Sequence, residues 1–118
     1  MVIRQGEVYW AELDEPSGSE PSGNRPYVVV QNNVFNESRM KTVLLCTVIS
    51  TLRRGQDAGN VPLNTGEANL PKPSVVVVSQ IVTLDKSQLG EYIGKLSKSR
   101  IRQILDGLQL LTEPRDAE

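Results

Sequence analysis

The sequence predicts a small α+β fold, a strongly curved and largely antiparallel sheet or barrel with one amphipathic helix packed on it. Two observations support this. Several short segments rich in apolar and β-branched residues follow one another with loops, mostly not helices, between them. Only the last part of the chain has apolar residues at the three- and four-residue spacing of a helix. We expect one domain over residues 1–112 and a tail over residues 113–118.

The first half of the chain contains three predicted strands. Residues 7–13 (EVYWAEL) form a short β-rich run, and residues 26–31 (PYVVVQ) and 42–49 (TVLLCTVI) are apolar enough for buried strands. Residues 14–24 (DEPSGSEPSGN) collect Pro, Gly and Ser and predict a loop, long enough to be functional. The polar stretch 32–41 has room for one turn of helix.

The second half contains the strongest strand prediction, residues 74–84 (SVVVVSQIVTL), which the polar pair Ser79 and Gln80 interrupts. The other predicted segments are a basic loop over 50–59, a weak strand over 61–63, a turn over 85–90 and a strand over 91–96.

The C-terminal segment predicts a helix with one apolar stripe. Ser97 or Ser99 can cap its start, and Pro114 lies just beyond its end. The stripe consists of Ile101, Ile104, Leu105, Leu108 and Leu111.

Composition excludes several classes of protein. The chain has 118 residues, 13 basic and 14 acidic side chains, and no histidine. The missing imidazole excludes Ser-His-Asp triads, His-paired cysteines and most catalytic zinc sites. A single cysteine, Cys46, cannot form an internal disulfide and fits a reducing cytoplasm. No apolar run approaches the ~20 residues of a membrane span, and the N-terminus lacks a signal-peptide core.

Charge is unevenly distributed along the chain. Between residues 25 and 54, five basic side chains face only one acidic side chain, Glu37. This stretch is either a phosphate-binding surface or an ordinary solvated face. Both readings stay open on the charges alone.

Four blocks, in order, resemble the MazF/PemK family of toxin endoribonucleases. Residues 5–10 (QGEVYW) are similar to the family's opening RGDIYW, and residues 18–26 contain its GSE and RP motifs. Residues 28–32 (VVVQN) resemble its LVVQN, and residues 74–94 resemble its DSVV…QIRTIDK…L…IG. The resemblance extends from about Gln5 to Leu111.

This resemblance implies an SH3-like barrel that works as a cytoplasmic homodimer. It implies cleavage of single-stranded RNA, chiefly mRNA, at short specific sequences, without a metal or other cofactor. It also implies a cognate antitoxin protein whose tail covers the RNA groove. No membrane partner is expected.

A domain without histidine can cleave RNA because the substrate contains its own nucleophile, the 2′-OH. The enzyme must align the attack and stabilise charge on the phosphorane oxygens. Arginine suits this task because its planar, charged fork pairs with two phosphate oxygens. By resemblance, Arg25 is the principal catalytic residue, and Glu20 orients it or transfers a proton. Pro26 biases Arg25 toward extended backbone geometry.

The sequence departs from the family at a second catalytic position, where Ile49 replaces a threonine. Three nearby hydroxyls can substitute: Thr47, on the same strand face, Ser50 and Thr51. A one-residue bulge at the strand end would bring Ser50 into the threonine's place, which makes Ser50 the favoured candidate, followed by Thr51.

Further candidate RNA contacts lie around the same motifs. Val82 stands where the family often has a basic residue, so a positive charge is missing there. Arg53 and Arg54 either compensate for this missing charge or form an ordinary basic loop. Tyr9 and Trp10 alternate on the first strand, so at least one faces the core. The candidates for RNA binding are Ser19, Asn24, Tyr27, Asn32, Arg53, Arg54 and Gln80.

Two alternatives belong to other functional classes. Ile49 and Val82 are compatible with a catalytically weakened member that binds RNA or an antitoxin through the same groove. An SH3-like peptide-binding module is less favoured, because aromatic residues, 4% of the chain, are too few to line a proline groove.

Overall fold

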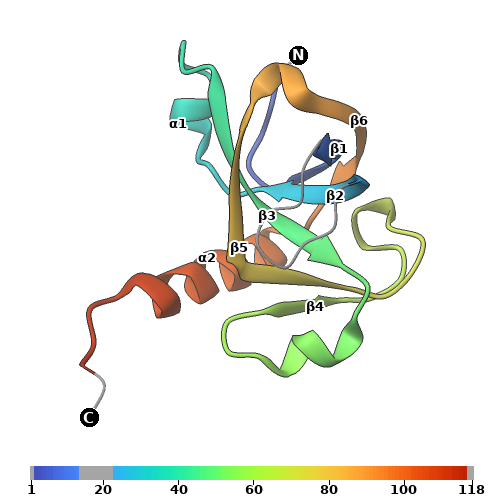
Figure 1. Ribbon diagram of the computed structural model, residues 1–118, viewed down its shortest axis with the longest axis vertical. Helices are drawn as coiled ribbons and strands as arrows, with labels where there is room; N and C mark the ends of the chain where they lie inside the picture. Colours follow the sequence, from blue (N-terminus) through green and yellow to red (C-terminus); the bar gives the residue numbers. More distant parts are fainter. Residues whose placement is uncertain (1, 14–22, 117–118) are drawn as a thin grey trace.

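The protein forms a curled six-stranded antiparallel sheet with a C-terminal helix, as Figure 1 shows for the computed structural model, which describes residues 2–13 and 23–116. The strand order is β4-β5-β3-β2-β1-β6. The predicted fold class is therefore confirmed. The strands are β1 (Glu7–Leu13), β2 (Gly23–Val29), β3 (Thr42–Ile49), β4 (Val61–Leu63), β5 (Ser74–Asp85) and β6 (Leu89–Lys95).

Helical segments are short except at the C-terminus. Helix α2 (Lys98–Thr112) begins after Ser97, whose hydroxyl accepts a hydrogen bond from the Arg100 amide at 3.2 Å, so Ser97 and not Ser99 is its cap. None of the described helices has the length and apolar character needed to span a membrane. The remaining helical turns are α1 (Asn33–Asn36), η1 (Leu52–Gln56), η2 (Glu67–Asn69) and η3 (Lys86–Gln88).

The predicted bounds of β1, β3 and β4 match the structure. Strand β5 is one residue longer than predicted, and β6 begins at Leu89 instead of residue 91, so the predicted turn over 85–90 is shorter. The largest difference is in β2. This strand begins at Gly23 and ends at Val29, instead of running from 26 to 31. Gly23 pairs with Leu13 and Asn24 pairs with Glu12, so the end of the predicted loop belongs to a β1–β2 hairpin. Pairing with a neighbouring strand outweighs the low strand propensity of Gly and Asn.

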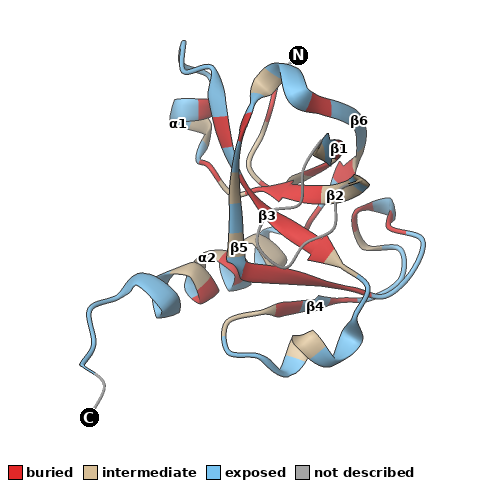
Figure 2. Cartoon of the chain, viewed as in Figure 1, coloured by how far each residue is buried: buried red, intermediate tan, exposed pale blue. Residues whose placement is uncertain are grey.

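Apolar side chains are buried in two core clusters. Figure 2 shows that many of the buried residues lie in the strands of the sheet. One cluster contains Val28, Cys46 and Val48 and packs against Ile104 of α2, while the other contains Tyr9 and its neighbours inside the curl. Burial raises the pKa of the Cys46 thiol to about 12, so this cysteine is an inert core residue, as predicted.

Strand β5 bends sharply, and the bend gives the sheet its curl (Figure 1). Cys46 of β3 pairs with Ile81, but the next residue, Thr47, pairs with Val77, so the residues from Val78 to Gln80 drop out of the register. The polar pair noted in the sequence therefore marks this irregularity.

Side chains replace the lost ladder bonds at the bend. The side-chain Oδ1 of Asn60 accepts from the Val78 backbone N–H at 3.1 Å, and the side-chain Nδ2 of Asn60 donates to the Arg54 backbone carbonyl at 2.9 Å. The Thr47 hydroxyl donates to the Gln80 carbonyl at 3.3 Å. Thus Asn60 ties the bend to the loop after β3.

The segment between β4 and β5 is fixed by polar contacts. Arg100 donates two bonds of 2.9 Å to the Glu67 carboxylate, and these bonds hold the pKa of that carboxyl below its ordinary value. The side-chain amide of Asn69 donates to the Ile93 backbone carbonyl at 2.9 Å. Gly94 lies so close to the Ala68 carbonyl that a Cβ would collide with it.

Replacing Asn60 by Ala is expected to leave the Val78 amide buried without an acceptor. We expect the free energy of unfolding to fall by about 1–3 kcal/mol. Urea titration followed by circular dichroism measures this loss. Asn64→Ala is the matched control, because the exposed Asn64 side chain makes no hydrogen bond within the described residues. Equal unfolding midpoints for the two variants would contradict the role of Asn60.

Candidate active site

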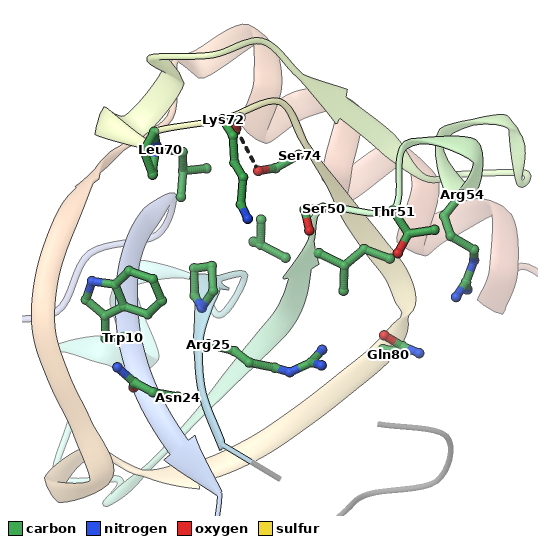
Figure 3. A pocket seen from close by; sticks show the side chains of 14 residues that line it. Trp10, Asn24, Arg25, Ser50, Thr51, Arg54, Leu70, Lys72, Ser74 and Gln80 are labelled. Carbon is green, nitrogen blue, oxygen red and sulfur yellow. Dashed lines mark hydrogen bonds between the residues drawn. The ribbon is translucent and has the colours of Figure 1, made fainter. Parts of the chain in front are cut away.

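A cavity of about 480 Å³ opens where β2 and β3 stop pairing (Figure 3). The β2–β3 ladder covers only Tyr27 to Val29 on β2, and it stops next to Pro26, which has no N–H to donate. The start of β2 therefore separates from the end of β3. The cavity is lined by Trp10 of β1, Asn24, Arg25 and Pro26 of β2, residues 48–51, Arg54, residues 70–72, Ser74, and Gln80 at the bend of β5.

Arg25 is the central basic residue of the cavity. Its backbone is fixed in the hairpin opposite Ala11, and its half-buried side chain extends across the cavity toward Gln80 (Figure 3). Within the described residues, the guanidinium makes no hydrogen bond or ion pair. Its donors are therefore available to a ligand.

The Arg53–Arg54 pair contributes less than the sequence suggested. Arg54 lines the cavity, but its Nε donates to the Asp57 carboxylate at 2.7 Å, so most of its charge is balanced. Arg53 is exposed on η1 and is not among the lining residues. Within this pair, only Arg54 can reach a ligand in the cavity.

Two of the three candidate hydroxyls reach the cavity. Ser50 and Thr51 are exposed and line it beside Ile49, whereas Thr47 is fully buried. Thr47 is therefore not a substitute for the missing threonine. The predicted bulge at the strand end is also wrong, because Ile49 pairs in register with Val75.

Gln80 reaches the cavity because of the bend in β5. Its Oε1 is buried and accepts no hydrogen bond in the described part of the chain. A buried amide acceptor without a partner costs free energy, about 1–3 kcal/mol, and is a natural contact for a ligand donor.

Lys72 is a cavity residue that the sequence analysis missed. Figure 3 shows its ammonium group directed into the cavity from the loop before β5. The only sequence signal is its position between two prolines, Pro71 and Pro73, which restrict the backbone. No pattern of residue types in the sequence identifies a single lysine as part of a site.

The remaining predicted residues have different places. Tyr27 is fully buried in the core. The Asn32 side chain accepts a hydrogen bond from the Phe35 backbone N–H and caps α1. Both were expected to contact RNA, but neither lines the cavity. Trp10 lines it, while Tyr9 is the core residue of that pair. Ser19 and Glu20 lie outside the described residues.

The cavity is basic although the whole chain has a net charge of −1. Its described lining contains three basic side chains, Arg25, Arg54 and Lys72, and no carboxylate. Hydroxyls, amides, the Trp10 indole and several apolar side chains, such as Ile49 and Leu70, complete the wall. Such a lining suits a phosphate-containing ligand with bases to stack or to hydrogen-bond.

Residues 4–112 match the family of PemK-like, MazF-like toxins of type II toxin–antitoxin systems. The chain belongs to this family. Two curated relatives are Endoribonuclease MazF2 from Mycobacterium bovis and Endoribonuclease MazF6 from Mycobacterium tuberculosis. Each is 39% identical over 109 residues, which cover 92% of this chain and 96% of the relative.

Solved MazF structures share the fold. An endoribonuclease in complex with its cognate antitoxin from a mycobacterial species superposes with a TM-score of 0.77, covering 97% of this chain and 99% of that chain at 23% identity. MazF from Deinococcus radiodurans gives a TM-score of 0.74, covering 94% and 96% at 22% identity. At these identities the likeness establishes the architecture, and the roles of side chains rest on the cavity itself.

Proposed function

We propose that this MazF-type toxin endoribonuclease cuts single-stranded RNA in the cavity at the diverging ends of β2 and β3, with Arg25 as its main catalytic residue. The observation that carries this proposal is the Arg25 guanidinium, which has no bonding partner among residues 2–13 and 23–116, in a cavity whose described lining has no carboxylate. The substrate is expected to be mRNA, cut at short specific sequences.

The reaction needs no nucleophile from the protein. The ribose 2′-OH attacks the adjacent phosphorus and forms the O2′–P bond, and the bond from phosphorus to the 5′-oxygen of the next nucleotide breaks. One proton leaves the 2′-OH and one is added to the departing 5′-oxygen, which leaves a 2′,3′-cyclic phosphate and a 5′-OH end. Arg25 stabilises the negative charge on the phosphorane oxygens.

Other groups assist in distinct ways. The Ser50 hydroxyl, or that of Thr51, donates to a phosphate oxygen in place of the missing threonine, since both line the cavity beside Ile49. Glu20 is proposed, from the family resemblance alone, to orient Arg25 or move a proton. Gln80 binds an N–H of a nearby base through its unpartnered Oε1.

The family also supports a biological setting. We propose that the toxin acts in the cytoplasm, as a homodimer, and is held inactive by a cognate antitoxin. One structural neighbour is itself in complex with its cognate antitoxin, and another from Deinococcus radiodurans is a MazE–MazF complex.

Arg25→Ala is expected to lower the rate of RNA cleavage about 100- to 1,000-fold, as removal of one oxyanion donor does in other enzymes. Cleavage of a long unstructured RNA is measured in EDTA by gel electrophoresis, with analysis of the new ends. Arg39→Ala, which removes an exposed arginine outside the cavity, should cleave normally. The proposal is wrong if the wild type leaves a panel of such RNAs intact at micromolar concentration.

Removing the hydroxyl that donates to the phosphate, by Ser50→Ala or by Thr51→Val, is expected to slow cleavage roughly tenfold or more, because both hydroxyls line the cavity beside Ile49 and one of them must replace the missing threonine. Single-turnover rates on one RNA compare the two variants. Ile49→Thr tests the weakened-member alternative and is expected to give no gain. A large gain in rate from Ile49→Thr would indicate that the wild type lacks the hydroxyl it needs.

Gln80→Ala is expected to relax the sequence preference of cleavage. Losing the base contact should reduce discrimination at one position of the target by about 10-fold or more, since a good base contact contributes about 1–3 kcal/mol. Mapping cut sites on a long RNA measures this change. Gln109→Ala, on the exposed face of α2, is the control. An unchanged pattern of cuts for Gln80→Ala would exclude base recognition by this side chain.

A further inference from the structure

Lys72 is the second cation of the cavity without a partner. Its ammonium makes no hydrogen bond or ion pair within the described residues, whereas Arg54, the other nearby base, is paired with Asp57. Lys86 illustrates the contrasting structural use of a lysine, because its Nζ donates to the Asn36 carbonyl at 2.9 Å. In the part of the chain that the structure describes, no hydrogen bond or ion pair therefore accounts for the position of the Lys72 side chain.

The backbone holds Lys72 in place even though its side chain is exposed. Pro71 and Pro73 restrict the chain on both sides, and the Ser74 hydroxyl donates to the Lys72 carbonyl at 3.0 Å. The preceding turn is fixed by the bonds from Arg100 to Glu67. The ammonium is therefore directed into the cavity by a constrained loop (Figure 3).

Lys72 and Arg25 enter the cavity from different elements. Arg25 comes from the start of β2, and Lys72 comes from the loop that leads into β5. A strand of RNA crossing the cavity presents successive phosphates, and one guanidinium cannot hold more than one of them well. A compact ammonium on a separate wall suits a neighbouring phosphate.

We propose that Lys72 is a positioning residue that binds the backbone phosphate next to the scissile one and so aligns the RNA across Arg25. This inference rests on the proposed cleavage of single-stranded RNA. Val82, which stands where a basic residue is frequent in the family, has no charge to offer a phosphate and packs half-buried against the second core cluster. Lys72 thus supplies a charge that β5 lacks.

The test is RNA binding over a series of KCl concentrations, using an RNA whose 2′-O-methyl groups prevent cleavage. For Lys72→Gln we expect the slope of log K against log salt to become shallower by about 0.7, the value for one phosphate contact on a single strand. Affinity at low salt should fall roughly tenfold. Lys72→Arg should retain most of the wild-type slope, because the charge is kept.

Lys41→Gln is the matched control, because Lys41 is exposed and precedes the far end of β3, whose eight residues span roughly 25 Å. Its salt slope should equal that of the wild type. Thermal melting should be unchanged for Lys72→Gln, and on cleavable RNA its KM should rise while kcat changes little.

Two results separate the failure of this inference from the failure of the proposed function. If the wild type binds and cuts RNA but Lys72→Gln keeps the wild-type salt slope and KM, the assignment of Lys72 alone is overturned. If the wild type neither binds the methylated RNA nor cuts unmodified RNA, both proposals are overturned.

Discussion

The bend of β5 at Val78–Gln80 is the constraint on which the rest of the structure depends. Both arms of β5 pair with β3, yet the bend residues between them are out of register. The irregular segment is stable because the side chains of Asn60 and Thr47 form hydrogen bonds with its main chain. A straight β5 would pair with β3 without interruption, and the sheet would lose its curl. The same bend buries Val78 in the cluster under α2 and places Gln80 at the cavity, so core packing and the candidate site have one geometric origin.

The cavity itself arises from an incomplete ladder. Pro26 stands where β2 and β3 separate, and the β1–β2 hairpin continues past that point, so the start of β2 is supported on only one side. Side chains at such a position are fixed by the hairpin but not covered by a neighbouring strand. Arg25 is therefore positioned without being buried, which is what a residue that binds an anion from solvent requires.

Most strands can be predicted from the local pattern of apolar residues, whereas the site depends on how distant strands pair in the sheet. Strands β3 and β4 were predicted with the bounds they have, because apolar and β-branched runs between loop residues have few other solutions. The start of β2 was predicted wrongly, since Gly23 and Asn24 become strand only through pairing with β1. Arg25 was predicted because the family motif marks it. Lys72 was not, because its relation to Arg25 depends on how the sheet brings two distant segments together, and no local sequence pattern encodes that juxtaposition.

Because the chain has no histidine, the candidate site relies on side chains that stay charged. A site that stabilises charge with arginine and lysine does so by fixed cations, and its selectivity comes from where they stand relative to hydroxyl and amide groups. In the proposed reaction the substrate's 2′-OH is the nucleophile, so the protein's main task is alignment, and alignment requires contacts at more than one phosphate. One arginine cannot define the direction of a flexible strand. A second cation on a separate constrained loop can, so in the proposed mechanism the rigid backbone at Pro71–Pro73 and the bend at Gln80 matter as much to the site as Arg25 does.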